Sequence, residues 1–474
     1  MNGHAQPGRR RTATVSILAP SLLGLGFAFG CLYAFSAARL NPWLVPAVVL
    51  ACLVSAVAYQ RPDIGVGIAL VIVPAGSLGI NPQLATYVVQ AFSVYLACVA
   101  FAGWRARGDD IRNLPGMATL VLIYLVVTLF SVTQSADLHS ASRFMRSLLT
   151  GGMLFAAVIF TVRGRRELLS ILAGATGGAL IVGLHAMREY MSGAPSSVGF
   201  ITNTGEVVGR LTAGFSQPNQ LGGFLVLLVP LAITCALLAR RWRGLFAFAA
   251  FAAAVGVYGS YSRGALIGLA LVPFVFMRGW RLWVVGPLVA LVVVLAAPNL
   301  VRERFATLTS SSSEVATRVD IWRTALNVWE SHPVIGVGLG GFPQAYAEAR
   351  LPGKVFLPST VFQPPPHAHD VFLQLLAEQG ILGFIAFVAI LVAAVRTTLR
   401  LRRSRDGPTR LLGSGLLAAL IAFLVHNLFD VTFEDPQTGL YVFVLLGLIA
   451  AAGFVYRESE QPEPSSASCK FAVK

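Results

Sequence analysis

Two arginines lie in segments of small residues that would let a ligand come close. Arg210 opens the segment RLTAGFSQPN (210–219), and Arg263 lies in the tetrapeptide YSRG (261–264), between two apolar runs. A guanidinium stays charged and presents a planar fork of donors, which suits a diphosphate. Each arginine could instead extend to lipid headgroups or pair with a carboxylate such as Glu206. The residues alone leave both interpretations open.

A histidine provides the third candidate for chemistry. His369 opens the segment HDVFLQLLAEQGILG (369–383), where a long polar stretch meets an apolar run. Histidine accepts a proton near neutral pH and could act as a general base, although backbone carbonyls could equally satisfy an interfacial histidine. His367 would allow a metal site, but two histidines without further ligand spacing indicate one only weakly. We therefore predict neither a metal nor another cofactor.

Other polar residues have simpler explanations. His426 and Asp430 are four residues apart, which predicts one helix face and a structural hydrogen bond. His139, Arg143 and Arg146 fall in a predicted short loop, where they could anchor the chain at the membrane surface or add positive charge to a site. The chain has no Walker-type phosphate loop, no G-x-S-x-G motif and no Asp-x-Asp cluster, so neither ATP nor a nucleotide-sugar donor is implied.

The composition identifies the elements that must position these residues. Of 474 residues, 56% are hydrophobic before the 46 glycines are counted, and only 12% are charged. The charged share is about half that of a soluble domain. No interior of this size could hide so much apolar surface, which excludes a soluble enzyme, a disordered chain and a fibrous protein. We expect an all-α, polytopic integral membrane protein.

Apolar runs long enough to cross a bilayer predict about 12–14 transmembrane helices. The candidate spans are 15–36, 43–59, 63–80, 83–103, 116–133, 146–162, 167–187, 217–239, 244–260, 263–277, 282–298, 381–397, 411–430 and 438–456. If the N-terminus is cytoplasmic, every short cytoplasmic connection carries Lys or Arg, as the positive-inside rule requires. The net charge of +15 therefore reflects membrane orientation and does not indicate nucleic acid. Both termini are expected in the cytoplasm.

The chain is expected to have five regions. They are a basic N-terminus (1–14), a transmembrane bundle (15–298), a long external loop (299–368), C-terminal transmembrane helices (369–456) and a disordered cytoplasmic tail (457–474). The external loop is too long to be a simple connection. Within it, TRVDIWRTALNVWE (317–330) has helical spacing, and glycines at 336, 338, 340 and 341 are expected to end the helix.

Taken together, these patches resemble the O-antigen ligase and polymerase superfamily of bacterial membrane glycosyltransferases. The matching patches are RLTAGFSQPN (210–219), SRG (262–264), Arg318-x-x-x-Trp322 followed by HPVIGVG (332–338), and HAHD (367–370) followed by GILG (380–383). The ligase pattern is His, then Asn, Ser or Gln, nine further residues and Gly-x-x-Gly-x-x-Thr. His369 and the glycines at 380 and 383 have this spacing, whereas Asp370 and Ala386 depart from it.

The resemblance implies a metal-independent, inverting glycosyltransferase at the periplasmic face of the bacterial inner membrane. Its donor would be a glycan on undecaprenyl diphosphate, and its acceptor another glycan or a lipid-linked glycan such as lipid A–core. Arg210 and Arg263 would bind the diphosphate, His369 would be the base, and the long loop would cover the site. The second-tier candidates are Arg318, Arg146, His367 and Asp370.

Three alternatives remain open. A polymerase would use the same donor chemistry to extend lipid-linked repeat units, so the arginines and histidine do not separate it from a ligase. Transfer to a protein Ser or Thr is a further variant, although the chain lacks the large extra domain expected for it. A transporter or flippase of lipid-linked glycans would need charged residues along a path through the membrane, and here the basic residues gather at the faces.

Overall fold

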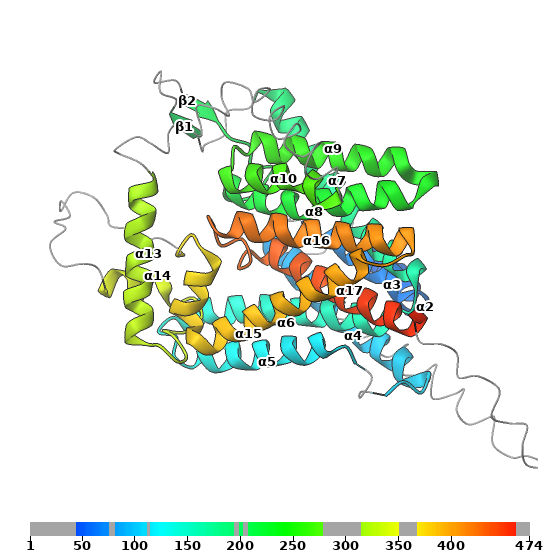
Figure 1. Ribbon diagram of the computed structural model, residues 1–474, viewed down its shortest axis with the longest axis horizontal. Coiled ribbons are helices and arrows are strands. Elements are labelled where there is room, and N and C mark those ends of the chain that lie inside the picture. Colours follow the sequence, from blue (N-terminus) through cyan, green and yellow to red (C-terminus); the bar gives the residue numbers. More distant parts are fainter. Residues whose placement is uncertain are drawn as a thin grey trace, which may run out of the picture.

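The computed structural model describes residues 44–74, 81–110, 114–193, 199–201, 207–277, 314–349 and 367–460. The described chain is a bundle of roughly aligned helices, with one helix lying across its end (Figure 1). The helices are α2 (Leu44–Gln60), α3 (Pro62–Ile72), α4 (Pro82–Ala106), α5 (Gly116–Val132), α6 (Leu138–Thr161), α7 (Arg165–Ser192), α8 (Pro218–Leu238), η3 (Arg240–Trp242), α9 (Arg243–Gly259), α10 (Arg263–Phe276), α13 (Glu314–Ser331), α14 (Phe342–Glu348), α15 (Val371–Arg402), α16 (Gly407–Asn427) and α17 (Pro436–Glu460). The strands β1 (Gly199–Ile201) and β2 (Val207–Gly209) form one short antiparallel hairpin.

The helices confirm the expectation of an all-α polytopic membrane protein. Within the described residues, eight helices are long and apolar enough to cross a membrane, and four shorter apolar helices accompany them. Each predicted span that lies largely in this part of the chain overlaps a helix, although residues 75–80 of the span 63–80 lie outside the described residues. The predicted spans 15–36 and 282–298 lie wholly outside them.

Two helices begin earlier than hydropathy predicted. α6 begins at Leu138 rather than 146, and α15 begins at Val371 rather than 381. The expectation that His139, Arg143 and Arg146 form a short loop is therefore wrong. These residues lie in the first turns of an amphipathic helix. Average hydropathy misses such turns, because it combines the polar and apolar faces of the helix.

The five expected regions lie only partly within the described residues. The basic N-terminus (1–14) lies outside them, as do 299–313 and 350–366 of the external loop. α17 ends at Glu460, inside the segment expected as the tail, and 461–474 are again outside.

The core is centred on α8 and α17. Over their most apolar windows, 83% and 89% of the residues are buried, more than in any other of the eight long helices. α8 begins with Pro218 at its first helical position, where the missing N–H costs nothing. Phe224 of α8 meets Tyr441 of α17 edge-on, with ring centroids 5.0 Å apart. Most other helices form an outer layer around this pair and leave one side exposed.

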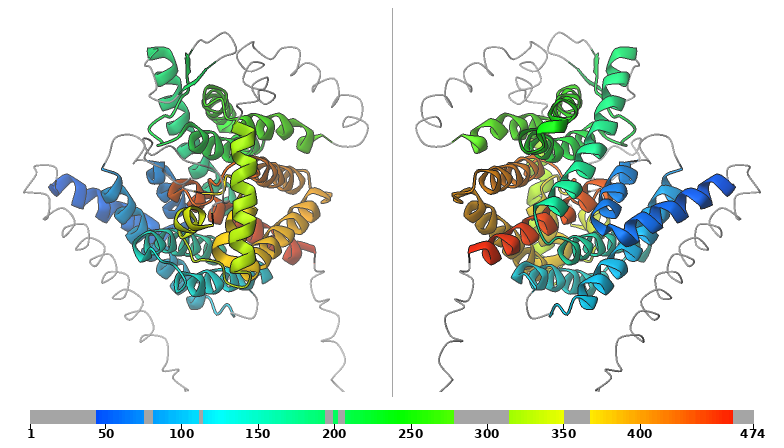
Figure 2. Two further views of the ribbon diagram at one scale, coloured as in Figure 1. Left: turned by 90° about the vertical axis from the view of Figure 1, so that its left-hand side faces the viewer. Right: turned by 90° about the vertical axis from the view of Figure 1, so that its right-hand side faces the viewer.

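The predicted external helix is α13, which stands across one end of the bundle (Figure 2). The chain after it pairs with a break in α15 at Gly380, where φ is +62° and ψ is −166°. Val337 N donates to Ala377 O at 2.9 Å, and Ile381 N donates to Pro333 O at 2.8 Å. These bonds fix the glycine-rich segment 333–341 to α15, which begins at Val371, two residues after His369.

Candidate functional site

Two histidines and an aspartate meet at the end of the bundle that α13 crosses. Asp430 Oδ1 lies 3.7 Å from His367 Nε2 and 3.6 Å from His369 Nδ1. The two imidazoles are in edge contact, with ring centroids 4.3 Å apart. The His369 side chain is 26% exposed, so it remains accessible from outside the protein, whereas its Nδ1 is buried and forms no hydrogen bond.

Helix ends hold this cluster in place. Asp370 caps α15, because its Oδ1 accepts hydrogen bonds from Phe372 N at 2.8 Å and Leu373 N at 2.9 Å. This cap orients the chain immediately after His369. On the other side, Asn427 Oδ1 accepts from Thr432 N at 2.9 Å and closes the loop that carries Asp430. Asp370 therefore has a structural role next to the histidines.

The expected hydrogen bond between His426 and Asp430 is not formed. α16 ends at Asn427, so Asp430 lies beyond the helix and the four-residue spacing no longer places the two side chains on one face. Neither ring nitrogen of His426 has a hydrogen-bond partner. Asp430 instead faces His367 and His369, a pairing between distant segments that sequence spacing did not reveal.

The charges of the cluster are set by burial and by one another. Burial lowers the pKa of His367 to about 4, with Arg318 and His369 acting in the same direction and Asp430 opposing them. Burial also opposes ionisation of Asp430, but the neighbouring imidazoles outweigh it and lower the pKa of this carboxyl. At neutral pH the cluster thus contains an ionised Asp430 beside a neutral His367.

Arg318 reaches the same loop from α13. Its Nη1 donates a hydrogen bond to the carbonyl of Phe429 at 2.6 Å, one residue before Asp430. The structure therefore brings Arg318 to the histidine cluster although it is far away in the sequence. α13 therefore brings the positive charge of Arg318 to the site.

Arg210 is buried and does not extend to the surface. Its Nε donates to Ser260 O at 2.8 Å, and its Nη2 donates to Asn219 Oδ1 at 2.7 Å. These bonds join the segment 210–219 to the turn before α10, which begins at Arg263. Both predicted arginines therefore belong to one structural unit.

Glycines pack this unit against the end of α16, just before the loop that carries Asp430. A Cβ added to Gly264 would lie 3.1 Å from His426 O, and one added to Gly223 would lie 2.6 Å from His426 Nε2. The start of α10 and the start of α8 thus both pack directly on His426 at the end of α16. Arg263 is the residue before Gly264, so the start of its helix lies beside the end of α16.

Backbone strain is concentrated in the same patches. Among the described residues, the non-glycine residues with positive φ are Ala213 (+44°), Tyr261 (+46°) and His369 (+55°). Such conformations cost about 1–3 kcal/mol each and accumulate at functional sites. The residue that holds the first of them was not predicted from the sequence. The Glu189 carboxylate accepts hydrogen bonds from Thr212 N and Ala213 N, at 3.2 Å and 2.6 Å.

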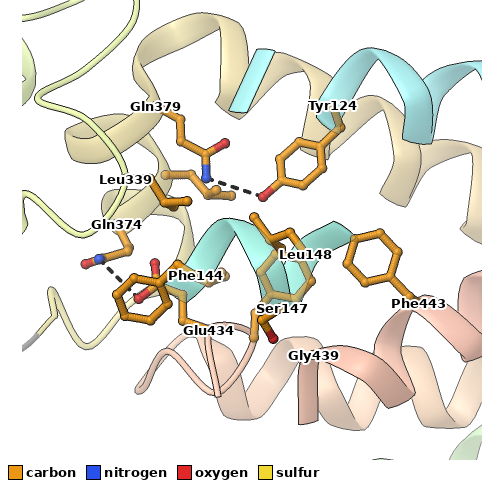
Figure 3. A pocket seen from close by; sticks show the side chains of 13 residues that line it. Tyr124, Phe144, Ser147, Leu148, Leu339, Gln374, Gln379, Glu434, Gly439 and Phe443 are labelled. Atoms are coloured by element: carbon orange, nitrogen blue, oxygen red, sulfur yellow. Dashed lines mark hydrogen bonds between the residues drawn. The ribbon is translucent and has the colours of Figure 1, made fainter. Parts of the chain in front are cut away.

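Buried polar side chains of α15 form hydrogen bonds to the elements packed against it. Figure 3 shows Gln379 donating to the Tyr124 hydroxyl and Gln374 donating to Glu434, both at 3.4 Å. The carboxylate of Glu378 accepts from Gly340 N at 2.9 Å and from Phe342 N at 3.0 Å, which anchors the segment after α13. Burial and the neighbouring Glu378 raise the pKa of Glu434. The sequence feature that could have indicated these buried polar residues is the pair Glu378-Gln379 inside an apolar run.

Arg146 does not join the histidine cluster. It lines a separate cavity of about 510 Å³ together with Arg143 and His139, all on the first turns of α6. The walls come from α4, α6, the start of α8 and the start of α17. Gln220 in this wall is next to Asn219, the partner of Arg210, so the cavity adjoins the arginine unit.

The cluster of His367, His369 and Asp430 also has donors that suit a metal ion. One donor atom from each residue can be chosen so that all three lie within 4.8 Å of one another. Imidazole and carboxylate are typical zinc ligands. The same three groups suit proton transfer, in which an ionised carboxylate orients a histidine.

The O-antigen ligase family model matches residues 248–388, a segment that contains Arg263, Arg318, His367 and His369. The comparison with curated proteins gave no match.

Proposed function

We propose that this chain is a membrane enzyme of the O-antigen ligase superfamily, whose family model matches residues 248–388, and that it is a ligase that transfers a glycan from undecaprenyl diphosphate to an acceptor hydroxyl. The acceptor is lipid A–core or a similar glycan. The reaction takes place at the periplasmic face of the inner membrane, needs no metal and inverts the anomeric configuration. The match to a family described as O-antigen ligase and the spacing from His369 to Gly380 and Gly383 favour ligation over polymerisation.

The proposed reaction is a single displacement. The acceptor hydroxyl oxygen attacks the anomeric carbon of the donor glycan, and the bond from that carbon to the diphosphate oxygen breaks. The bonding pair leaves with undecaprenyl diphosphate, and His369 takes the proton of the attacking hydroxyl. Attack opposite the leaving group inverts the configuration.

The arrangement of His369 against Asp430 is the observation that carries the proposal. With Nδ1 facing Asp430 Oδ1 at 3.6 Å, the opposite ring nitrogen, Nε2, points away from the carboxylate and is the atom available to the acceptor. The ionised carboxylate would stabilise the imidazolium that forms when His369 takes the proton. A small closure would turn the 3.6 Å separation into a hydrogen bond, as catalytic contacts often tighten when substrate binds.

The leaving group requires fixed positive charge. Cleavage places a developing negative charge on the diphosphate, which guanidinium groups stabilise without a metal or a nucleotide. Arg318 on α13 bonds to the loop that carries Asp430, and Arg263 opens α10, whose Gly264 packs on His426. Arg210 bonds to the turn before α10. We assign the diphosphate to Arg210 and Arg263 and a supporting contact to Arg318.

A deletion strain separates this function from its alternatives. Lipid-linked glycans would be resolved by chain length and compared with the finished surface polysaccharide, with the wild-type gene and the His369→Ala variant reintroduced as controls. A ligase leaves long undecaprenyl-linked chains that never reach the acceptor, and only the wild-type gene restores transfer. Single repeat units on carrier and acceptor would instead indicate a polymerase. Glycans trapped in the cytoplasmic leaflet would indicate a flippase.

A further inference from the structure

The cavity of about 510 Å³ beside the arginine unit has no role in the donor chemistry described above. Its volume falls within the range of small-molecule sites, about 300–1,000 Å³. A transferase needs a second site for its acceptor next to the first. We propose that this cavity binds the acceptor glycan through an anionic group, a phosphate or a carboxylate, held by Arg143 and Arg146. This inference rests on the proposed function.

The charges of the cavity favour an anion. Arg143 and Arg146 lie three residues apart on α6, so their side chains share one face of the helix. Among the described residues, neither is in an ion pair with a carboxylate; Arg146 Nε donates to the carbonyl of Ser142 at 3.3 Å. Asp435 also lines the cavity, but its Oδ2 accepts two hydrogen bonds from Thr438 at the start of α17.

The glutamines in the lining suit a sugar better than a lipid headgroup. Four glutamines contribute to the walls, namely Gln83, Gln90, Gln220 and Gln437. The side-chain oxygen of Gln437 is buried and has no hydrogen-bond partner. Such an acceptor requires a donor, which a sugar hydroxyl supplies and an ionised phosphodiester does not.

The position of the cavity fits an acceptor site. Asn219 bonds to Arg210, while the next residue, Gln220, lines the cavity. In the same way, Asp430 faces the histidines, and Gln437 further along that segment lines the cavity. Two short chain segments, 219–220 and 430–437, therefore connect the proposed donor site to the cavity. An acceptor anchored in the cavity could extend a hydroxyl toward His369.

The test uses the purified full-length chain in phosphatidylcholine nanodiscs. Binding of glucose 6-phosphate and of glucose would be measured by saturation-transfer NMR. We expect glucose 6-phosphate to bind at least tenfold more tightly, the double variant Arg143→Gln/Arg146→Gln to lose this preference, and Arg143→Lys/Arg146→Lys to retain much of it. Arg188→Gln, an exposed arginine on α7 outside the cavity, is the matched control and should behave like the wild type. Equal binding of the two sugars, or no binding of either, would overturn the proposal.

Two further experiments identify the source of the anion and test the cavity independently of the proposed transfer reaction. If nanodiscs containing phosphatidylglycerol abolish the binding of glucose 6-phosphate, a lipid headgroup is the occupant and the glycan assignment fails. In transfer assays, the double glutamine variant should raise the acceptor KM at least tenfold. If the wild-type chain transfers no glycan, the proposed function fails, whereas the sugar preference and its loss in the variant still decide the chemistry of the cavity.

Discussion

His369 occupies a backbone conformation that is rare outside glycine, and its ring contacts a histidine and faces an aspartate from another part of the chain. The sequence predicted His369, Arg210 and Arg263 as candidates because their residue types suit the chemistry. It could not predict Asp430 or Glu189, which act on residues far away along the chain. Those partners depend on how helix ends pack, and a short spacing such as that of His426 and Asp430 was misleading where the helix ended early.

A substitution at Arg263 tests whether its positive charge alone is enough or whether the planar guanidinium is needed. Arg263→Lys keeps the positive charge but removes the planar fork of donors, so we expect transfer to fall about 10–100-fold if two phosphate oxygens are held at once. Initial rates with purified protein would measure this. Arg241→Lys, an exposed arginine beside Trp242, is the matched control. A rate equal to that of the wild type would assign Arg263 to lipid anchoring.

His367 predicts a dependence of stability on pH. Its pKa falls from the ordinary 6.5 to about 4 in the folded protein, so between these values the unfolded chain binds more protons and the free energy of unfolding decreases as the pH falls. His367→Gln should remove up to about 3 kcal/mol of this loss. Thermal unfolding between pH 6.5 and pH 4 would measure it, with the exposed His332→Gln as control. An unchanged acid response in His367→Gln would show that His367 is already charged near pH 6.

At the scale of elements, apolar runs predicted where helices form because hydropathy is a local property of the chain. They missed the first turns of α6 and α15, where Arg143, Arg146 and Gln374 face a cavity or a polar interior. They also could not show that the segment after α13 pairs with the break in α15, because that pairing joins segments about forty residues apart. The glycine spacing after His369 has a structural cause here, since Gly380 makes the break possible.

Gly380 tests this element directly. A Cβ at this position would lie 2.3 Å from the carbonyl oxygen of Val334, and φ of +62° with ψ of −166° is essentially restricted to glycine. Gly380→Ala should destabilise the protein by at least about 1–3 kcal/mol and reduce transfer, because the segment after α13 would separate from α15. Melting temperature and transfer rate would be compared with Gly103→Ala, a helical glycine with more room. Wild-type values for both would refute the positioning role of the break.

At the scale of the whole molecule, α13 and the β1–β2 hairpin lie toward the same end of the bundle (Figure 1). Arg318 is on α13, and Arg210 directly follows β2. Arginines such as those of η3 lie at the opposite end, which the positive-inside rule predicts to be cytoplasmic. The exposed apolar residues of α5, Leu122, Leu129 and Phe130, suit contact with lipid chains.

This orientation can be measured in a cysteine-free background. Ser331→Cys places a thiol at the end of α13, and Arg241→Cys places one in η3 at the other end. A membrane-impermeant maleimide should label the first in intact spheroplasts and the second only after lysis. Labelling of Arg241→Cys in intact spheroplasts would place the histidine cluster in the cytoplasm and contradict the proposed reaction.

The proposed reaction is the transfer of a glycan from a lipid diphosphate by His369, Arg210 and Arg263 without a metal. The most direct measurement uses purified protein, undecaprenyl-diphosphate-linked glycan and lipid A–core oligosaccharide in the presence of EDTA, with products analysed by mass spectrometry and NMR. We expect one glycosylated acceptor per undecaprenyl diphosphate released, an inverted anomeric configuration, and a loss of transfer of at least about 10²-fold in His369→Ala. Transfer that requires an added metal, retains the configuration, or continues at the wild-type rate in His369→Ala would contradict it.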